Sequence, residues 1–172
     1  MNVLSRALTK ILPIVLGVTL LFLAVSITAC SGKSDNTQSS GLIAPTWIQA
    51  EVADNSVAIS LSEVETNRMT HFTMNASGGE MDFMAYELGG KTYVRASICP
   101  PCYSRSFSLK GDTLVCDTCG TSFDAKTGSG IKGACVNYPK ASVSYTVDDD
   151  SIVMKVDGLV TTYNNTLAPG LP

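Results

Sequence analysis

Histidine and clustered positive charge are scarce in this 172-residue chain, and each absence excludes a class of function. The only histidine, His71, has no motif around it, so a catalytic triad has no support and we expect no catalytic residues. Lys and Arg number 12 against 15 Asp and Glu. Because nucleic acid binding requires clustered basic side chains, this mildly acidic composition excludes a nucleic acid partner.

The chain also lacks a convincing amphipathic helix after its N-terminal segment. From Trp47 onward the apolar residues follow a period of two, which is typical of strands. Residues 56–61, for example, place Val57, Ile59 and Leu61 on one side. Turn residues separate several such runs and predict hairpins, at Gly89-Gly90, at Gly111-Asp112 and at Asp148-Asp149-Asp150. We therefore predict an all-β domain over residues 47–172, folded as a small barrel or sandwich.

One long apolar run is present, at the N-terminus. Two basic residues, Arg6 and Lys10, precede the almost wholly apolar segment 11–28, which leads to Cys30. This order of regions is typical of a secretory signal. The last four residues, Ile27-Thr28-Ala29-Cys30, resemble the bacterial lipobox, in which the cysteine receives diacylglycerol. An uncleaved transmembrane helix is the alternative, since 18 apolar residues can just span a bilayer.

This segment predicts where the protein resides. We expect a lipoprotein signal peptide over 1–29, followed by the lipidated Cys30 and a flexible linker over 30–46. Its acyl chains would anchor an extracytoplasmic domain to the cell membrane, or to the outer membrane if the cell has one. Basic residues before the apolar run favour that orientation.

Five further cysteines lie in the segment 97–139, which we call the cysteine lobe. Its composition is poor in large aliphatic residues, so we expect it to lack a hydrophobic core of its own. Two CxxC pairs, Cys99/Cys102 and Cys116/Cys119, flank a predicted hairpin. Two facing CxxC turns can form a tetrahedral four-sulfur site, which suits zinc, a single iron or an iron–sulfur cluster. The lobe is thus predicted to bind metal.

Disulfides and thiol redox chemistry are the alternatives to a metal site. An oxidising compartment would permit disulfides, although five cysteines cannot all pair. A thioredoxin-like function is disfavoured because neither CxxC pair opens a predicted helix, the feature that lowers a thiol pKa. The fifth cysteine, Cys135, lies on a Gly-flanked loop after the second pair, and we expect it beside the site as an accessory ligand.

The cysteine pattern resembles the FtrD-like family of membrane iron–sulfur proteins, which is associated with bacterial iron uptake. The resemblance rests on Cys99-Pro-Pro-Cys102, on the hairpin and Cys116-Asp-Thr-Cys119-Gly120 that follow, and on Gly133-Ala-Cys135. Ala134 departs from the pattern, because the family has a second glycine there. The resemblance implies an iron–sulfur cluster or iron as cofactor, and a membrane redox or iron-transport partner.

A second resemblance concerns residues 111–128, which are similar to the second cluster loop of Rieske proteins. Cys119 stands where those proteins have a histidine ligand, and in the first loop Pro101 occupies the other histidine position. The resemblance therefore implies a Rieske-like fold with ligation by sulfur alone. A zinc-ribbon-like lobe is the alternative for the same residues.

The remaining candidate ligands are assigned to structural positions. We expect His71 on a strand face, either exposed or hydrogen-bonded. The methionines at 69, 74, 81 and 84 could suggest copper, but Met81 and Met84 differ in parity and so face opposite sides of a strand. Core filling is the better interpretation.

Taken together, these patterns favour a membrane-anchored extracytoplasmic metal or iron–sulfur binding protein that serves electron transfer or iron uptake. A structural zinc-ribbon module is the second hypothesis, and a thiol–disulfide oxidoreductase is the third.

Overall fold

The structure, a computed structural model, describes residues 41–170. The predicted signal peptide 1–29, the lipidation site Cys30 and most of the predicted linker lie outside the described residues. Two short strands, β1 (Leu42–Ile43) and β2 (Thr46–Trp47), form within the last part of that linker range. The strands of the domain therefore begin before the predicted boundary at residue 47.

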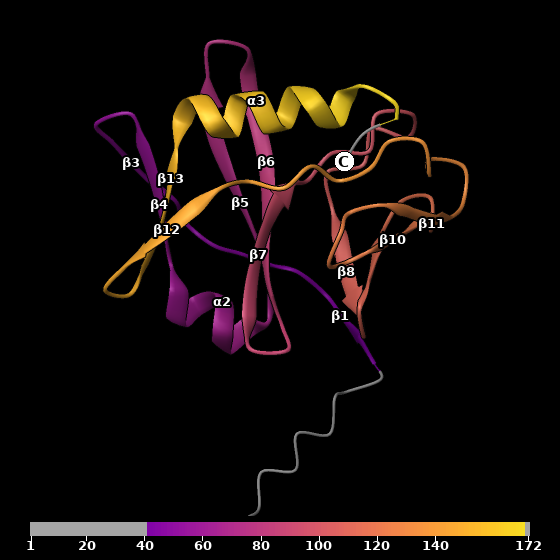
Figure 1. Cartoon of the computed structure of the whole chain (residues 1–172), viewed down its shortest axis with the longest axis horizontal. Coiled ribbons are helices and arrows are strands. Elements are labelled where there is room, and N and C mark those ends of the chain that lie inside the picture. Colours follow the sequence, from indigo (N-terminus) through magenta and orange to yellow (C-terminus); the bar gives the residue numbers. More distant parts are fainter. Residues whose placement is uncertain (1–40, 171–172) are drawn as a thin grey trace, which may run out of the picture. The chain divides into compact units, whose positions relative to one another are not determined.

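The strands of the described residues form three β-sheets (Figure 1). The first has the order β12-β13-β4-β3, the second β2-β5-β6-β7 and the third β1-β8-β9-β10-β11. All neighbouring strands are antiparallel except β2 and β5, which are parallel. The bounds are β3 (Glu51–Ala53), β4 (Ser56–Ser60), β5 (Met69–Ala76), β6 (Gly79–Leu88), β7 (Lys91–Ala96), β8 (Phe107–Lys110), β9 (Thr113–Cys116), β10 (Ser122–Asp124), β11 (Gly130–Lys132), β12 (Tyr145–Asp148) and β13 (Ser151–Lys155).

The hairpins predicted from turn residues are confirmed. The Gly89-Gly90 pair connects β6 to β7, where Leu88 pairs with Lys91. Gly111-Asp112 connects β8 to β9 in the same way. Because successive side chains of a strand point to opposite faces, these registers decide which residues meet in each core.

Strand β6 separates two hydrophobic cores, because both of its faces are buried. Phe83 and Ala85 face a core that the first sheet also lines. On the opposite face, Met84 and Tyr86 pack against side chains of the cysteine lobe, among them Phe107, Leu109, Leu114 and Phe123. Composition predicted that the lobe lacks a hydrophobic core of its own. The lobe instead shares a core with the second sheet, which we call the central sheet.

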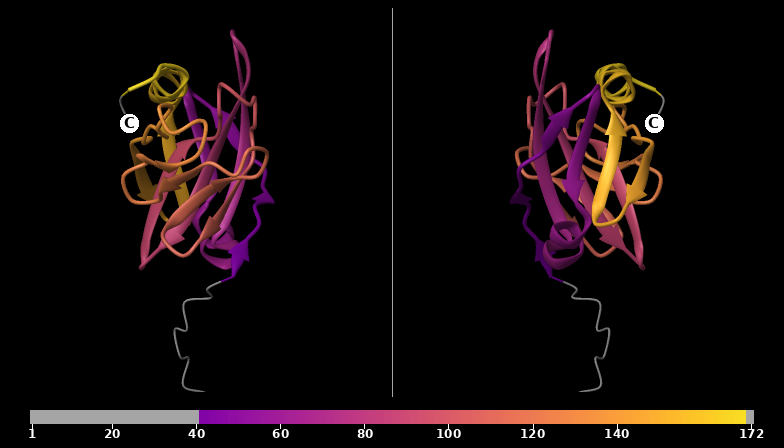
Figure 2. Two further views of the ribbon diagram at one scale, coloured as in Figure 1. Left: turned by 90° about the vertical axis from the view of Figure 1, so that its right-hand side faces the viewer. Right: turned by 90° about the vertical axis from the view of Figure 1, so that its left-hand side faces the viewer.

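Two helices are present in the described residues, contrary to the expectation that none follows the N-terminal segment. Helix α2 (Leu61–Asn67) begins at Ser60, whose side chain accepts a hydrogen bond from the backbone N–H of Glu63. Leu61 thus opens a helix and does not continue the strand. Helix α3 (Val156–Leu167) packs against β7 and β13, and the side views show it end-on above the strands (Figure 2). Within residues 41–170 neither helix is long and apolar enough to cross a membrane.

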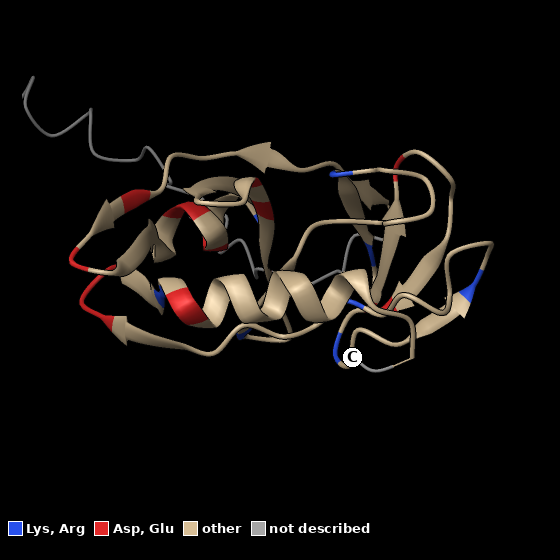
Figure 3. Ribbon diagram, turned by 90° about the horizontal axis from the view of Figure 1, so that it is seen from above, with Lys and Arg blue, Asp and Glu red and all other residues tan. Residues whose placement is uncertain are grey.

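Charge is unevenly distributed over the described residues (Figure 3). Residues 97–140 contain five Lys or Arg and three Asp or Glu, whereas the other described residues contain four and eleven. The part of the molecule that holds the cysteines is therefore the less acidic part, which favours placing negatively charged thiolates there.

Candidate metal centre

The first CxxC pair lies in a tight turn, which is separated from the end of β7 by two residues. The backbone N–H of Cys99 donates to the carbonyl oxygen of Ser104 at 2.8 Å, and the N–H of Cys102 donates to the carbonyl of Cys99 at 3.2 Å. Tyr103 has a positive φ of 57°, which is uncommon for a bulky residue. These hydrogen bonds close the turn, and both of its thiols point toward the second CxxC pair.

The second CxxC pair forms an equivalent turn at the end of β9. The N–H of Cys116 donates to the carbonyl of Thr121 at 2.9 Å, again five residues further on. Gly120 has a φ of 68° and holds the place that Tyr103 holds in the first turn. Neither turn opens a helix. This geometry differs from a redox-active CxxC pair at a helix N-terminus.

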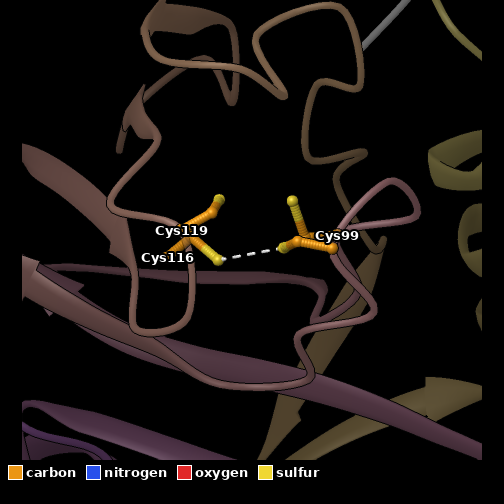
Figure 4. Close-up of side chains that lie close together, drawn as sticks. Cys99, Cys116 and Cys119 are labelled. Carbon is orange, nitrogen blue, oxygen red and sulfur yellow. Dashed lines mark hydrogen bonds between the residues drawn. The ribbon is translucent and has the colours of Figure 1, made fainter.

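The two turns bring four sulfur atoms together. The Sγ atoms of the two pairs, at 99, 102, 116 and 119, all lie within 4.8 Å of one another. Figure 4 shows Cys99 facing Cys116 and Cys119 from the opposite turn. The Sγ atoms of Cys102 and Cys116 are 3.7 Å apart. None of the five cysteines among residues 41–170 forms a disulfide.

Cys135 lies beside this group, as its loop position had indicated. Its Sγ is 3.7 Å from that of Cys119, and it is buried. The loop reaches the second turn because Gly133, with a φ of 122°, lies against Thr121, where an added Cβ would be 2.5 Å from Oγ1. The N–H of Cys135 donates to that hydroxyl oxygen at 3.2 Å. The sulfur of Cys135 therefore borders the group of four through Cys119.

Burial and hydrogen bonding divide the thiols into two kinds. Burial raises the pKa of Cys99 and of Cys116, so both favour the neutral thiol in the absence of metal. Burial also acts to raise the pKa of Cys119, but hydrogen bonds outweigh it, led by the Thr121 hydroxyl 3.2 Å from the sulfur, and the pKa of Cys119 falls to about 6. Cys119 is exposed, and it marks the open side of the site.

A carboxylate within the second CxxC turn holds that turn in place. The Asp117 side chain accepts hydrogen bonds from the hydroxyls of Ser106 and Ser108, at 2.5 and 2.7 Å. Its own N–H donates to the carbonyl of Ser106 at 3.1 Å. We did not predict this role for Asp117. The alternating serines before and within β8, with an aspartate inside the CxxC turn, were the available signal.

Two buried cations also escaped sequence analysis. Arg95 donates to the phenolic oxygen of Tyr86 at 2.9 Å and to the carbonyls of Lys126 and Lys140 at 2.6 Å each. Lys140 is fully buried, and burial lowers its pKa to about 8, although the nearby cysteines act to raise it. No motif in the sequence marks these two residues as buried.

His71 and the methionines are not part of the sulfur group, although Met69 and Met84 pack in the same core as Cys99, Cys116 and Cys135. His71 is fully buried on β5, where its ring contacts the edge of Trp47 at 5.1 Å between centroids and its Nδ1 lies 3.4 Å from the Ser97 hydroxyl. Burial lowers its pKa to about 4. The methionines at 69, 74, 81 and 84 are buried in the two cores, which confirms that they fill space.

The sulfur spacing fits a metal centre. A tetrahedral ion with metal–sulfur bonds of about 2.3 Å holds its sulfurs roughly 3.8 Å apart. The observed spacing of 3.7 Å for Cys102 and Cys116, with all four sulfurs within 4.8 Å, is close to that value. Coordination deprotonates thiols outright, so burial of Cys99 and Cys116 does not oppose it. The donor set is all sulfur, which suits zinc, iron and iron–sulfur clusters.

Comparison with known proteins shows the family to which the chain belongs. The family described as "Membrane iron-sulfur containing protein FtrD-like" matches residues 64–165, which include all five cysteines of the site. No sequence among curated proteins matches the chain.

Several solved structures are similar to part of the chain. One is a chain of the complex of reduced oxygenase and oxidised ferredoxin in carbazole 1,9a-dioxygenase, with a TM-score of 0.49 and 18% identity over 60% of this chain and 95% of that one. The ferredoxin of carbazole 1,9a-dioxygenase from Nocardioides aromaticivorans IC177 has a TM-score of 0.44 and 20% identity, covering 57% and 93%. The ferredoxin of Sphingomonas yanoikuyae B1 has a TM-score of 0.38 and 21% identity, covering 43% and 74%.

Proposed function

Because the chain belongs to the FtrD-like family of membrane iron–sulfur containing proteins, we propose that it carries an iron–sulfur cluster, or iron, and transfers electrons at the outer face of a cell membrane. The observation that carries this proposal is the donor set, because four cysteine sulfurs from two equivalent turns converge and sulfur ligands suit both iron and iron–sulfur clusters. The ligands we assign are Cys99, Cys102, Cys116 and Cys119.

The chain's own residues would give the bound group its environment. An iron–sulfur cluster supplies one-electron transfer, with a potential set by net charge, hydrogen bonds to sulfur and exposure. Cys99 and Cys116 lie in the shared hydrophobic core, so they close one side to water. The exposed Cys119 on the other side is the shortest route for an electron to or from a partner. The Cys119 thiol donates to the Thr121 hydroxyl oxygen at 3.2 Å, and once metal binding removes the thiol proton that hydroxyl can donate to the sulfur instead.

Placement at the membrane rests on the N-terminal sequence. The segment before Cys30 is typical of a lipoprotein signal, and the family is one of membrane proteins. We propose that acyl chains on Cys30 anchor the domain outside the cytoplasm, since two basic residues precede the apolar run. The FtrD-like family is associated with bacterial iron uptake, which supports a role in reducing iron during transport. The partner would then be a membrane redox protein or an iron-transport protein.

The proposal is tested on the full-length chain, purified anaerobically from membranes in detergent. We expect brown protein with visible charge-transfer absorbance and iron as the main metal. The variant C99S/C116S should lose both the colour and the iron, because it removes one ligand from each turn. The matched control C135S removes a neighbouring thiol and should keep both. Colourless protein without iron would contradict the proposal.

A structural zinc site is the second candidate, and one observation favours it. The sulfur spacing of at most 4.8 Å fits a single ion, whereas two irons would require the two sulfur pairs to move apart. In that case the metal only joins the two turns, and the β surface binds a partner. One zinc per chain in colourless protein from the same purification would identify this function.

A further inference from the structure

Lys140 lies at the back of the cysteine site as a fully buried cation. None of its surface is exposed, and its Nζ donates to the carbonyl oxygen of Ile98 at 2.6 Å. Ile98 directly precedes the first ligand cysteine. The ammonium also lies over the rings of Phe107 and Phe123, at 5.2 and 4.6 Å from their centroids. These contacts fix the charge inside the core that the lobe shares with the central sheet.

No carboxylate neutralises this charge within residues 41–170. The ion pairs found there involve Arg68 and Arg105, and no Asp or Glu oxygen lies within 4.0 Å of the Lys140 Nζ. One carbonyl and two aromatic faces offset only part of the cost of removing an ammonium from water. Buried charges are normally paired with an opposite charge or coordinate a metal, and an ammonium cannot coordinate one. The counter-charge must therefore come from another kind of group.

The cysteine sulfurs are the acidic groups that Lys140 faces. Burial lowers the pKa of Lys140, and the charges of Cys99, Cys116, Cys135 and Cys102 act in the opposite direction. The two rings beneath it pack in the same core as three of these cysteines. Phe107 is also the register partner of Cys116 across the β8–β9 hairpin. A metal bound by four thiolates leaves excess negative charge close to this ammonium.

The backbone of Lys140 is held on both sides, so its position is built into the fold. Its N–H donates to the carbonyl of Gly128 at 2.8 Å, and its carbonyl accepts from Arg95 Nη1 at 2.6 Å. Gly128 has a φ of 83°, and an added Cβ would overlap the Lys140 carbonyl oxygen. The close approach of these segments places the side chain behind the sulfurs.

We propose that Lys140 is a positioning residue that supplies the internal counter-charge of the metal centre. This inference rests on the proposed metal site, but not on which metal occupies it. Binding a divalent ion to four thiols releases protons and leaves the ligand set with net negative charge, which a fixed ammonium stabilises. If the centre is a redox group, the same charge stabilises the reduced form and raises the reduction potential.

Zinc affinity of the full-length, metal-free, reduced protein in detergent tests the inference. The probe is Zn²⁺ alone, in competition with a chromophoric chelator. We expect K140M, which keeps an unbranched apolar side chain one atom shorter and removes the charge, to bind zinc at least tenfold more weakly than the parent. K140R keeps a cation and should stay within about threefold. The control K132M removes an exposed lysine of the same lobe and should stay within twofold.

Four other outcomes would overturn the inference or the metal site on which it rests. Zinc binding by K140M within twofold of the parent overturns the inference while leaving the metal site intact. An equal loss in K132M overturns it too, because surface charge would then explain the effect. Failure of metal-free K140M to fold like the parent also overturns it, since the lysine would then be needed for packing. If the parent binds no zinc, the proposed metal function itself fails.

A second readout uses protein loaded with its native metal. If that group is redox-active, the midpoint potential of K140M should be lower by at least a tenfold change in the reduced-to-oxidised ratio, which is about 59 mV for one electron. K132M should retain the parent potential. An unchanged potential in K140M contradicts the electrostatic role even if zinc affinity falls.

Discussion

The sulfur of Cys135 lies 3.7 Å from the sulfur of Cys119, although the residues are 16 positions apart in the chain. Thr121 connects them, because its hydroxyl oxygen accepts from the N–H of Cys135 and lies 3.2 Å from the sulfur of Cys119. The four sulfurs that lie within 4.8 Å of one another nevertheless do not include Cys135. It therefore borders the proposed ligand set.

This arrangement makes the two kinds of cysteine distinguishable. We expect C135S to retain at least half of the metal bound per chain, because four thiolates complete a tetrahedral site. C116S should lose nearly all of it, since it removes a buried ligand. Metal analysis of both full-length variants provides the measurement. Equal metal loss in the two would instead identify Cys135 as a ligand.

Because Gly128 lies so close to Lys140, adding a methyl group at position 128 is predicted to lower the stability of the fold strongly. G128A should lower the free energy of unfolding by about 3 kcal/mol, because the residue has a positive φ and the added Cβ would overlap the Lys140 carbonyl. Gly158 is a matched control, since it lies in α3 with nothing within 4 Å of an added Cβ. G158A should raise stability by about 0.5–1 kcal/mol. Chemical denaturation measures both, and similar values for the two would refute the packing argument.

The guanidinium group of Arg95 on β7 is predicted to hold the cysteine lobe against the central sheet through its hydrogen bonds. R95K keeps the charge but cannot reproduce hydrogen bonds to Tyr86, Lys126 and Lys140 together. We expect a loss of about 3 kcal/mol, because buried carbonyls are left without a donor. R68K alters an ion pair of 3.8 Å between partly exposed side chains and should cost less than about 0.5 kcal/mol. Thermal unfolding of the two variants side by side tests this, and equal shifts would count against the assigned role.

Burial of His71 predicts a dependence of stability on pH. Its pKa is about 4 in the folded protein and 6.5 in the unfolded chain, so the unfolded state takes up the proton first as pH falls. The protonation of His71 should not affect the free energy of unfolding above pH 6.5. Between pH 6.5 and pH 4 it should lower that free energy by up to about 3 kcal/mol. H71L removes the titrating group, so the parent should lose more stability than H71L between pH 7 and 4.5. Parallel pH profiles for the two proteins would disprove this explanation.

The features that could be predicted from the sequence are those that depend on residues close together in the chain. The glycine pairs and acidic turn residues predicted hairpins that the structure contains, and Met81 and Met84 were correctly assigned to opposite faces of one strand. The spacing of the two CxxC pairs also predicted that their sulfurs converge. In each case the relevant residues are close in sequence or joined by a single hairpin.

Both helices were missed for identifiable reasons. Ser60 and Glu63 occupy the positions of a capping box, but the preceding alternation of Val57 and Ile59 suggested a continuing strand. In α3 the apolar residues at 156, 159, 160, 163 and 167 have helical spacing. Glycine, threonine and asparagine between them have low helix propensity and obscured that period.

The shared core and buried cations depend on contacts distant in sequence. Composition indicated that the lobe lacks a core of its own, but it could not show that Met84 and Tyr86 of β6 supply the other half of a shared core. The environment of Lys140 is likewise formed by segments near residues 98, 107 and 123. Lysine is almost never fully buried, so no sequence rule would have placed it there.

The ratio of acid-labile sulfide to iron in the full-length, anaerobically purified protein is the most direct test of the central claim. An iron–sulfur cluster held by the cysteines of the two turns predicts a ratio near one, with both elements lost in C99S/C116S. Iron without sulfide would mean a single iron centre. Zinc in place of iron, with no sulfide, would contradict the claim and leave a structural metal site.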